Sequence, residues 1–355
     1  MVRQLKLSHT KSISKESKMK KLLIFFIVLM MSSVSLFASG EQDTSEVTQV
    51  KVALLLPSSA DDKGWSQGMY DAAMRVADSS EGKMVIEYSE NMKPVDAGSA
   101  ARQYIAQGFS YIVFHGTQFN NTVVELAEDF PEVTLIFGTS SELLGDNIIS
   151  YQPATEQPGY LSGIIAGMAT QTGKIGIVGP VDGGDAAQYN RGFWLGIKSV
   201  NPDAEIGVAH TGSYGDYVKA GELAQTFIND GFDILAGSAQ QGLGALQAVA
   251  QYPDKEVYWM GTSELHYQGP EGYKLMAACT YYYDPIFDSV LEAFNRGETS
   301  IEGQVLWLTI PNGGFTFSMA EENALLNDDI RGAVKDAEDK LMSGDLKIDW
   351  QSVKY

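Results

Sequence analysis

The stretch FINDGFDILA, residues 227–236, decides the fold because it repeats the pattern of YIAQGFSYIV, residues 104–113. In each stretch a helix-like run ends at a glycine, which suits a helix C-terminus, and a Phe and an apolar strand follow. A second pair, VALLLP at 52–57 and IGIVGP at 175–180, has the same separation of 123 positions. Any two strand–helix units look alike, but a shared separation favours a chain built from two similar halves.

Short apolar runs, often β-branched, alternate with helix-like stretches along most of the chain. We expect strands at 50–56, 84–88, 111–115, 133–137, 174–178, 206–210, 233–236, 257–260 and 274–278. Helices are expected near 66–78, 95–107, 120–129, 157–171, 187–200, 217–230 and 243–251. This alternation predicts an α/β protein with two doubly wound parallel-sheet lobes. Because ligands of such sheets bind beyond the carboxyl ends of the strands, we expect the ligand cleft between the lobes.

The amino terminus has the layout of a secretory signal peptide, which we place at 1–40 with Met19 as the true start. Its apolar run is too short to span a bilayer comfortably, and a polar leader follows at 41–49. A lipoprotein signal needs a cysteine at the cleavage point, and the only cysteine is Cys279. We therefore expect a soluble, exported, periplasmic protein that has no lipid anchor and no intramolecular disulfide.

The charge balance is strongly acidic. The whole chain has 25 basic and 45 acidic residues, and residues 1–40 hold seven of the basic and one of the acidic ones. Cleavage after residue 40 would leave 18 basic and 44 acidic residues, which is a net charge of −26. Such a surface repels phosphate backbones and anionic headgroups, so neither nucleic acid nor an anionic membrane is an expected partner.

An exposed aromatic marks the first half of the expected cleft. Trp65 follows the first strand, in a turn flanked by Gly64 and Ser66, although large aromatics are usually buried in cores. There it would form a wall against which a flat ligand stacks. Polar candidates near it, or after the strand at 111–115, are Asp62, Ser66, Gln67, His115, Thr117 and Gln118.

The second half has a comparable loop, VDGGDAAQYNRGFW at 181–194, with Asn190 and an aromatic set of Tyr189, Phe193 and Trp194. We expect this set to form a second aromatic wall. Polar candidates after the strands at 233–236 and 257–260 are Gln240, Gln241, Thr262 and Glu264. The lining is mostly neutral and suits a neutral polar solute, although each of these residues could instead cap a helix or shape a turn.

Catalytic signatures are missing from the sequence. There is no G-x-S-x-G or H-E-x-x-H motif, no Walker loop and no cysteine cluster for zinc. We expect neither a metal nor a cofactor, and we expect no enzyme activity. A hydrolase of nucleosides or sugars would need an acid–base pair in the cleft, for which Asp62 with Glu264 is the only candidate.

Several segments resemble the basic membrane protein (BMP) family of bacterial solute-binding proteins, which includes the purine-nucleoside receptor lipoproteins. The most specific is YLSGIIAGMATQTGKIGIVGP at 160–180, and the likeness covers roughly 50 to 320. It is supported by DKGWSQGMYDAA, VVELAEDFPEVTLIFGTS, NRGFWLGIKSVNPDAEIGVAHTGSYGD and YYYDPIFDSVLEAFNRG.

The resemblance implies a type I periplasmic-binding-protein fold that captures a small solute, often a nucleoside, for an ABC importer. It implies that Trp65 and Phe193 are the stacking pair. It also places Thr262 where the family has a ribose-binding Asp, so either Glu264 takes that role or the ligand lacks the diol. HGTQF, at 115–119, stands where the family has a Gly-rich loop, a second departure from the nucleoside pattern.

The sequence thus predicts a periplasmic binding protein for a small planar polar solute, with a purine nucleoside as the first candidate. Its partners are the solute and an ABC permease, and we expect a monomer. We assign 50–151 with 284–306 to lobe 1 and 152–283 with 307–355 to lobe 2. The alternatives are a receptor domain that presents its ligand to a membrane sensor, and the exported hydrolase.

Overall fold

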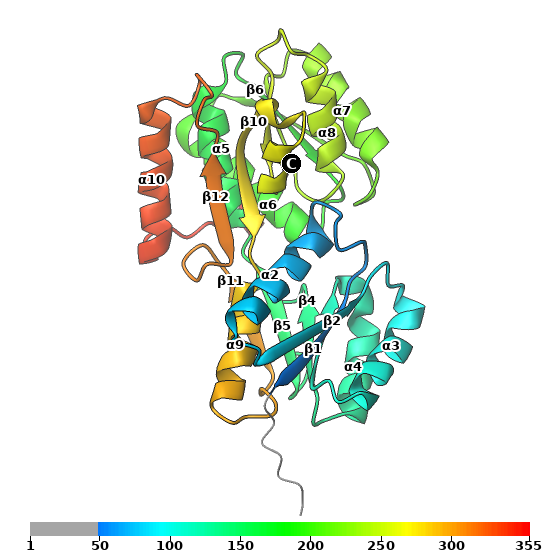
Figure 1. Cartoon of the computed structure of the whole chain (residues 1–355). Coiled ribbons are helices and arrows are strands. Elements are labelled where there is room, and N and C mark those ends of the chain that lie inside the picture. Colours follow the sequence, from blue (N-terminus) through cyan, green and yellow to red (C-terminus); the bar gives the residue numbers. More distant parts are fainter. Residues whose placement is uncertain (1–48) are drawn as a thin grey trace, which may run out of the picture. The chain divides into compact units, whose positions relative to one another are not determined.

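The computed structural model describes residues 49–355. The expected signal peptide at 1–40, the start at Met19 and nearly all of the leader at 41–49 lie outside the described residues. Within the described part, no helix combines the length and the apolar character needed to cross a bilayer. Two six-stranded sheets with helices packed on them form two lobes (Figure 1).

The sheet of lobe 1 is parallel throughout, in the order β11-β5-β4-β3-β1-β2. Its strands are β1 (Val50–Leu55), β2 (Met84–Ser89), β3 (Tyr111–His115), β4 (Thr134–Gly138), β5 (Ile148–Pro153) and β11 (Gln304–Leu308). β3 and β4 are buried along their whole length, because helices cover both faces of the sheet.

Alternate residues of β1 point to opposite faces of this sheet and meet different helices. Val52 and Leu54 pack with α2 and α9, whereas Ala53 and Leu55 pack with α3 and α4. The helices are α2 (Trp65–Ser79), α3 (Pro94–Ala106), α4 (Asn120–Asp129) and α9 (Asp284–Asn295). Figure 1 shows the two pairs on either side of the sheet.

The sheet of lobe 2 has the equivalent order, β12-β10-β9-β8-β6-β7, and only β12 runs antiparallel. Its strands are β6 (Lys174–Gly179), β7 (Glu205–His210), β8 (Ile234–Ala236), β9 (Tyr258–Gly261), β10 (Leu275–Tyr281) and β12 (Phe315–Met319). Each of the first five occupies the place of the corresponding strand of lobe 1. This equivalence confirms the two similar halves and the two doubly wound lobes.

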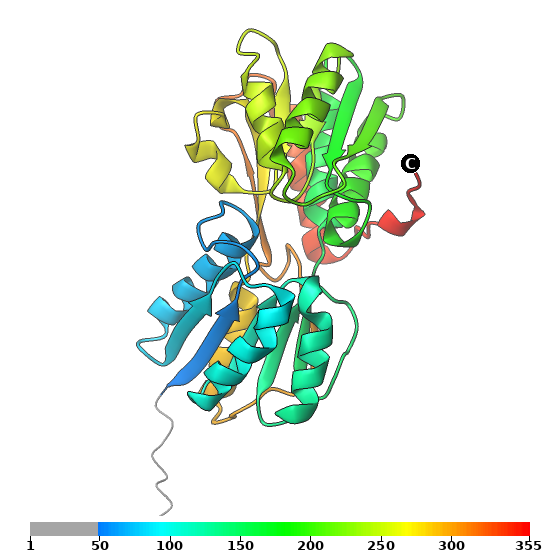
Figure 2. The ribbon, with the colours of Figure 1, turned by 90° about the vertical axis from the view of Figure 1, so that its right-hand side faces the viewer.

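The helices of lobe 2 also divide between two faces. Ile175 and Ile177 of β6 pack with α5, α6 and α10, whereas Val178 packs with α7 and α8. The helices are α5 (Glu156–Ala169), α6 (Gly184–Val200), α7 (Tyr217–Asn229), α8 (Gly242–Ala250) and α10 (Asp328–Ser343). In Figure 2 the helices of this lobe again lie on both sides of its sheet.

Within residues 49–355 the chain crosses between the sheets at 153–156, 281–284 and 308–315. The first two crossings exchange helices between the lobes. Helix α5 follows strand β5 of lobe 1 but packs on α6 of lobe 2, and α9 follows β10 of lobe 2 but packs on α2 of lobe 1. Tyr281, at the second crossing, packs against the cores of both lobes.

Candidate functional site

A cavity of about 680 Å³ lies between the lobes, at the carboxyl ends of the parallel strands. Lobe 1 lines it with the loops after β1, β3 and β4 and with the first turns of α2. Lobe 2 lines it with the loops after β6 to β9 and with residues 280–283. The strand-end rule therefore predicts the position of the cavity correctly.

Trp65 begins helix α2 and lines the cavity. Its indole stacks on the imidazole of His115, with ring centroids 4.3 Å apart and planes 12° from parallel. The indole Nε1 donates to the carbonyl oxygen of His115 at 3.2 Å, and the rings of Tyr281 and Tyr283 approach it edge-on. One face of the indole is thus supported by protein, and the residue remains part of the cavity wall.

His115 lies behind Trp65 and is not part of the cavity lining, which corrects the expectation that it contacts the ligand directly. Its Nδ1 is 2.6 Å from the hydroxyl of Tyr151, and its Nε2 is 2.9 Å from the backbone oxygen of Trp65. Burial lowers the pKa of His115 to about 3, against the opposing effect of the bond to Trp65. The imidazole is therefore neutral near pH 7, and its place in the structure makes it a support for Trp65.

Asp62 lines the cavity, but its carboxylate is occupied by the chain around it. It accepts hydrogen bonds from the backbone N–H groups of Gly64, Ser66 and Gln67 and from the hydroxyl of Ser58. These bonds satisfy free donors at the head of α2. Asp62 therefore holds the loop that presents Trp65.

Ser66 and Gln67 do not line the cavity, which corrects their expected role as ligand contacts. Ser66 is fully buried, and its hydroxyl lies 2.6 Å from that of Ser58. The side-chain oxygen of Gln67 accepts from the backbone N–H of Lys63 at 3.0 Å. Both side chains turn back onto the 58–64 loop because they lie one and two residues past the start of the helix.

Five other predicted residues do line the cavity. Thr117 and Gln118 come from the short turn after β3, and Gln240, Thr262 and Glu264 come from lobe 2. The lobes approach closely at Gln240, because a Cβ on Gly64 would lie 3.4 Å from the Gln240 Cγ. The Glu264 carboxylate accepts from the hydroxyl of Thr316 at 3.2 Å. Gln241, by contrast, is buried away from the cavity and donates to the carbonyl oxygen of Val178.

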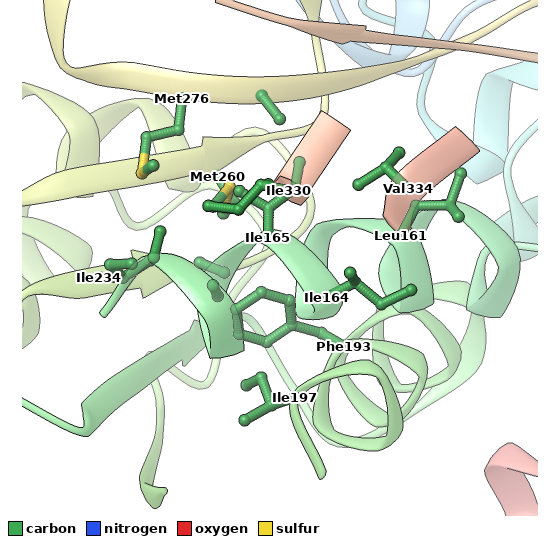
Figure 3. Close-up of a cluster of buried hydrophobic side chains, with 14 of the residues drawn as sticks. Leu161, Ile164, Ile165, Phe193, Ile197, Ile234, Met260, Met276, Ile330 and Val334 are labelled. Atoms are coloured by element: carbon green, nitrogen blue, oxygen red, sulfur yellow. The ribbon is translucent and has the colours of Figure 1, made fainter. Parts of the chain in front are cut away.

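The expectation that Phe193 faces Trp65 across the cleft is wrong. Phe193 is fully buried in the apolar core of lobe 2, among residues of α5, α6 and the sheet (Figure 3). Only the head of α6, at Gly184 and Asp185, reaches the cavity. Phe193 lies eight residues further along, which corresponds to about 12 Å of helix. At that depth α6 packs tightly on α5.

The rest of the expected second wall is also buried or turned away. Tyr189 is fully buried, and its hydroxyl lies 3.2 Å from that of Ser162. Asn190 is buried against Gly179 at the end of β6, and Trp194 packs beside Tyr355. None of these residues lines the cavity.

The structure adds aromatic and charged lining residues that the sequence did not single out. Tyr214, in the loop after β7, is 43% exposed, and Tyr281 to Tyr283 line the cavity at a crossing between the lobes. The sequence signal for Tyr281 to Tyr283 is the run YYYD at 281–284, which follows an apolar run. Asp185, in the first turn of α6, follows a glycine pair, a pattern that does not separate a ligand contact from a helix cap.

The cavity lining also includes titratable groups, among them Arg75, Lys63 and His266. Arg75 pairs with Asp284 through two hydrogen bonds of 3.0 and 2.7 Å, and its guanidinium lies 4.6 Å from the ring centre of Tyr282. The bond to Asp284 raises the pKa of Arg75. On the other side, burial lowers the pKa of His266 to about 4, and the positive charge of Lys63 from lobe 1 adds to this. His266 is therefore neutral near pH 7.

Comparison with known proteins identifies the family. The model of the Bmp family, described as PnrA-like ABC transporter substrate-binding proteins, matches residues 49–351. The chain belongs to this family. The family's members bind small molecules and work with transporter permeases, and they are solute-binding proteins rather than enzymes.

Individual relatives agree with this assignment. TsgA13 of Haloferax volcanii, named as an ABC transporter glucose-binding protein, is 27% identical over 86% of this chain and 75% of its own. Basic membrane protein D of Borreliella burgdorferi is 21% identical over 95% of this chain and 97% of its own.

A solved structure shows the same fold. The solute-binding protein of an ABC transporter system from Conexibacter woesei covers 84% of this chain and 98% of its own, with a TM-score of 0.71 and 24% identity. The fold is the two-lobed type I periplasmic-binding fold, as expected, and the protein is an ABC transporter solute-binding protein.

Proposed function

We propose that this protein captures a small planar polar solute, with a purine nucleoside as the first candidate, and delivers it to the permease of an ABC importer. The observation that carries the proposal is the indole of Trp65, which is backed by His115 on one face and belongs to the wall of a cavity between two lobes. Stacking of a nucleobase on such a face contributes about 1–3 kcal/mol.

The remaining lining suits a ligand that combines a flat ring with several hydrogen-bonding groups. Neutral donors and acceptors come from Thr117, Gln118, Gln240 and Thr262. Such groups fix orientation without demanding a charged ligand. They favour a nucleoside over a purely apolar ring.

In this proposal the lobes, 50–151 with 284–306 and 152–283 with 307–355, close on the ligand by hinge motion at the three crossings. The protein acts as an exported periplasmic monomer. Presentation of the ligand to a membrane sensor would use the same cleft, and a change in transport on loss of the protein distinguishes the two roles.

A monosaccharide is the second candidate, because TsgA13 is named as a glucose-binding protein. Both ligand classes can stack on the indole of Trp65. Only a nucleoside carries a planar base, and the affinity of that base can be measured without the sugar.

The test is titration calorimetry with adenosine, guanosine, inosine, D-ribose and D-glucose. We expect at least one nucleoside to bind more tightly than either sugar. In Trp65→Ala its affinity should fall by about 5- to 150-fold, the equivalent of the stacking energy. Trp65→Phe should retain most of the affinity, because a flat ring remains. Tight binding of glucose with no binding of any nucleoside would overturn the proposal.

A further inference from the structure

We propose that Asp185 binds the sugar hydroxyls of the ligand and thereby selects nucleosides over free bases; this inference rests on the proposed function. Asp185 lies in the first turn of α6 and lines the cavity. The resemblance to the family implies that Thr262, and not Asp185, stands where the family has its ribose-binding Asp.

The backbone of Asp185 is held in place. Its carbonyl oxygen accepts from the hydroxyl of Thr155 at 2.7 Å, which ties the head of α6 to the first crossing between the lobes. A group held in this way loses little conformational freedom when a ligand binds.

The carboxylate of Asp185 has one side-chain partner among residues 49–355, the hydroxyl of Tyr281 at 3.5 Å, and it also accepts from the backbone N–H groups of Asp185 and Ala186 at the head of α6. No Lys or Arg of the described residues lies within ion-pair distance, so the carboxylate keeps the capacity to accept from a ligand. The other acids of the lining differ in this respect. Asp62 accepts four hydrogen bonds, Glu264 accepts from Thr316, and Asp71 lies one helical turn before Arg75.

The carboxylate of Asp185 suits a neutral ligand that carries hydroxyl groups, and it does not require a cationic one. The N-terminal end of α6 carries partial positive charge and stabilises the ionised form, while burial raises the pKa of Asp185. The ionised group accepts hydrogen bonds and donates none, so two neighbouring hydroxyls can each donate to one of its oxygens. A ribose offers such a pair, and a free base does not.

Tyr281 connects this carboxylate to the stacking surface. Its ring approaches Trp65 edge-on with centroids 6.0 Å apart, and its hydroxyl points to Asp185. A single ligand can therefore place a base on Trp65 and a sugar at Asp185.

The experiment measures affinities of adenosine, 2′-deoxyadenosine and adenine for the wild-type protein, Asp185→Asn and the matched control Glu264→Gln. We expect wild-type affinity to fall in the order adenosine, 2′-deoxyadenosine, adenine. Asp185→Asn should weaken adenosine binding roughly 10- to 100-fold, as loss of hydrogen bonds to a charged group does, and leave adenine unchanged. Glu264→Gln should have the smaller effect on adenosine.

Thermal unfolding without ligand shows that each variant folds. Adenosine binding that is equal in Asp185→Asn and the wild type would overturn the role of Asp185 alone. A larger loss in Glu264→Gln would move that role to Glu264. If the wild-type protein binds none of adenosine, guanosine and inosine, the proposed function fails, and the role of Asp185 fails with it. If it binds guanosine or inosine but not adenosine, the same comparison is made with that nucleoside, its 2′-deoxy form and its base.

Discussion

Trp65 illustrates how a residue type usually found in a core becomes a binding surface. His115 stacks on one face of its indole, and the rings of Tyr281 and Tyr283 contact the indole in T-shaped arrangements. Asp62 fixes the loop before it by four hydrogen bonds. The indole is therefore already positioned before a ligand arrives, which reduces the entropic cost of stacking.

The buried histidine behind Trp65 predicts a dependence of stability on pH. The pKa of His115 is about 3 in the folded protein and about 6.5 in an unfolded chain. Below pH 6.5 the unfolded chain therefore takes up a proton that the folded protein does not, and the free energy of unfolding falls. The fall approaches about 1.4 kcal/mol per pH unit for one such group.

Urea unfolding between pH 7 and pH 4.5 measures this slope. His266 contributes in the same direction, and the raised pKa of Asp185 contributes in the opposite one. The informative comparison is therefore wild type against His115→Gln, which should lose part of the decline. Equal slopes in the two proteins would show that His115 is not a buried neutral group.

Phe193 provides a second test at the level of a single residue. Because it lies in the core of lobe 2, Phe193→Leu should lower the melting temperature and leave the affinity of the folded protein within about twofold of wild type. Thermal unfolding and calorimetry of the same sample measure both quantities. A large loss of affinity with an unchanged melting temperature would contradict this prediction and would indicate that Phe193 contacts the ligand.

At the level of secondary-structure elements, the close packing of α5 on α6 determines which residues of α6 are buried in the core of lobe 2. Glycines recur every fourth residue on the facing sides, at 159, 163 and 167 of α5 and at 192 and 196 of α6. A methyl group on Gly163 would overlap the carbonyl oxygen of Phe193, and one on Gly196 would overlap that of Tyr160. The helices therefore pack backbone against backbone, which buries Phe193.

This contact predicts opposite effects for two Gly→Ala substitutions within helices. Gly163→Ala should destabilise the protein, because the helices must move apart to admit the methyl group. Gly332→Ala, in the exposed part of α10 with open space around it, should stabilise by up to about 1 kcal/mol through helix propensity. Urea denaturation of both variants measures the difference. Equal effects would mean that α5 and α6 are not in close contact.

The strand and helix pattern predicted most elements within two or three residues, because buried parallel strands are short apolar runs bounded by turns. It missed β5, α9, β11, β12 and α10. β11 and β12 lie at the edges of their sheets and are only partly buried. The sequence of β12, FTFSM, alternates apolar and polar residues, and the apolar run of β11, VLWL, is only four residues long. α10 buries four side chains on one narrow stripe of a mostly charged helix.

The site could be predicted only where the chain passes directly from a strand into a loop. That rule placed Trp65, Thr117, Gln240 and Thr262 correctly at the cavity. It failed for Phe193, because it ignores how far a residue lies inside its helix. The repeated glycines of α5 and α6 were the signal that could have corrected it. Asp185 was missed because one carboxylate after two glycines resembles an ordinary helix cap.

On the scale of the whole described unit, the two lobes share one cavity and three crossing segments. Tyr281 packs against the cores of both lobes, its ring contacts that of Trp65, and its hydroxyl lies 3.5 Å from the carboxylate of Asp185. A ligand that fills the cavity therefore contacts both lobes at once. Binding and the relative position of the lobes should be coupled.

Ligand binding should stabilise the folded protein and make it more compact. At a ligand concentration 1,000 times the Kd, mass action adds about 4 kcal/mol to the free energy of unfolding. Small-angle scattering should show a smaller radius of gyration with a bound nucleoside than without it. Stabilisation with no change in radius would mean that the cleft does not close on its ligand.

The most direct measurement for the whole account is a crystal structure of the protein with the purine nucleoside that binds most tightly. The account predicts the base parallel to Trp65, about 3.5–4 Å from the indole face opposite His115. A nucleoside bound elsewhere on the protein, or one in the cavity whose ring does not contact Trp65, would contradict it.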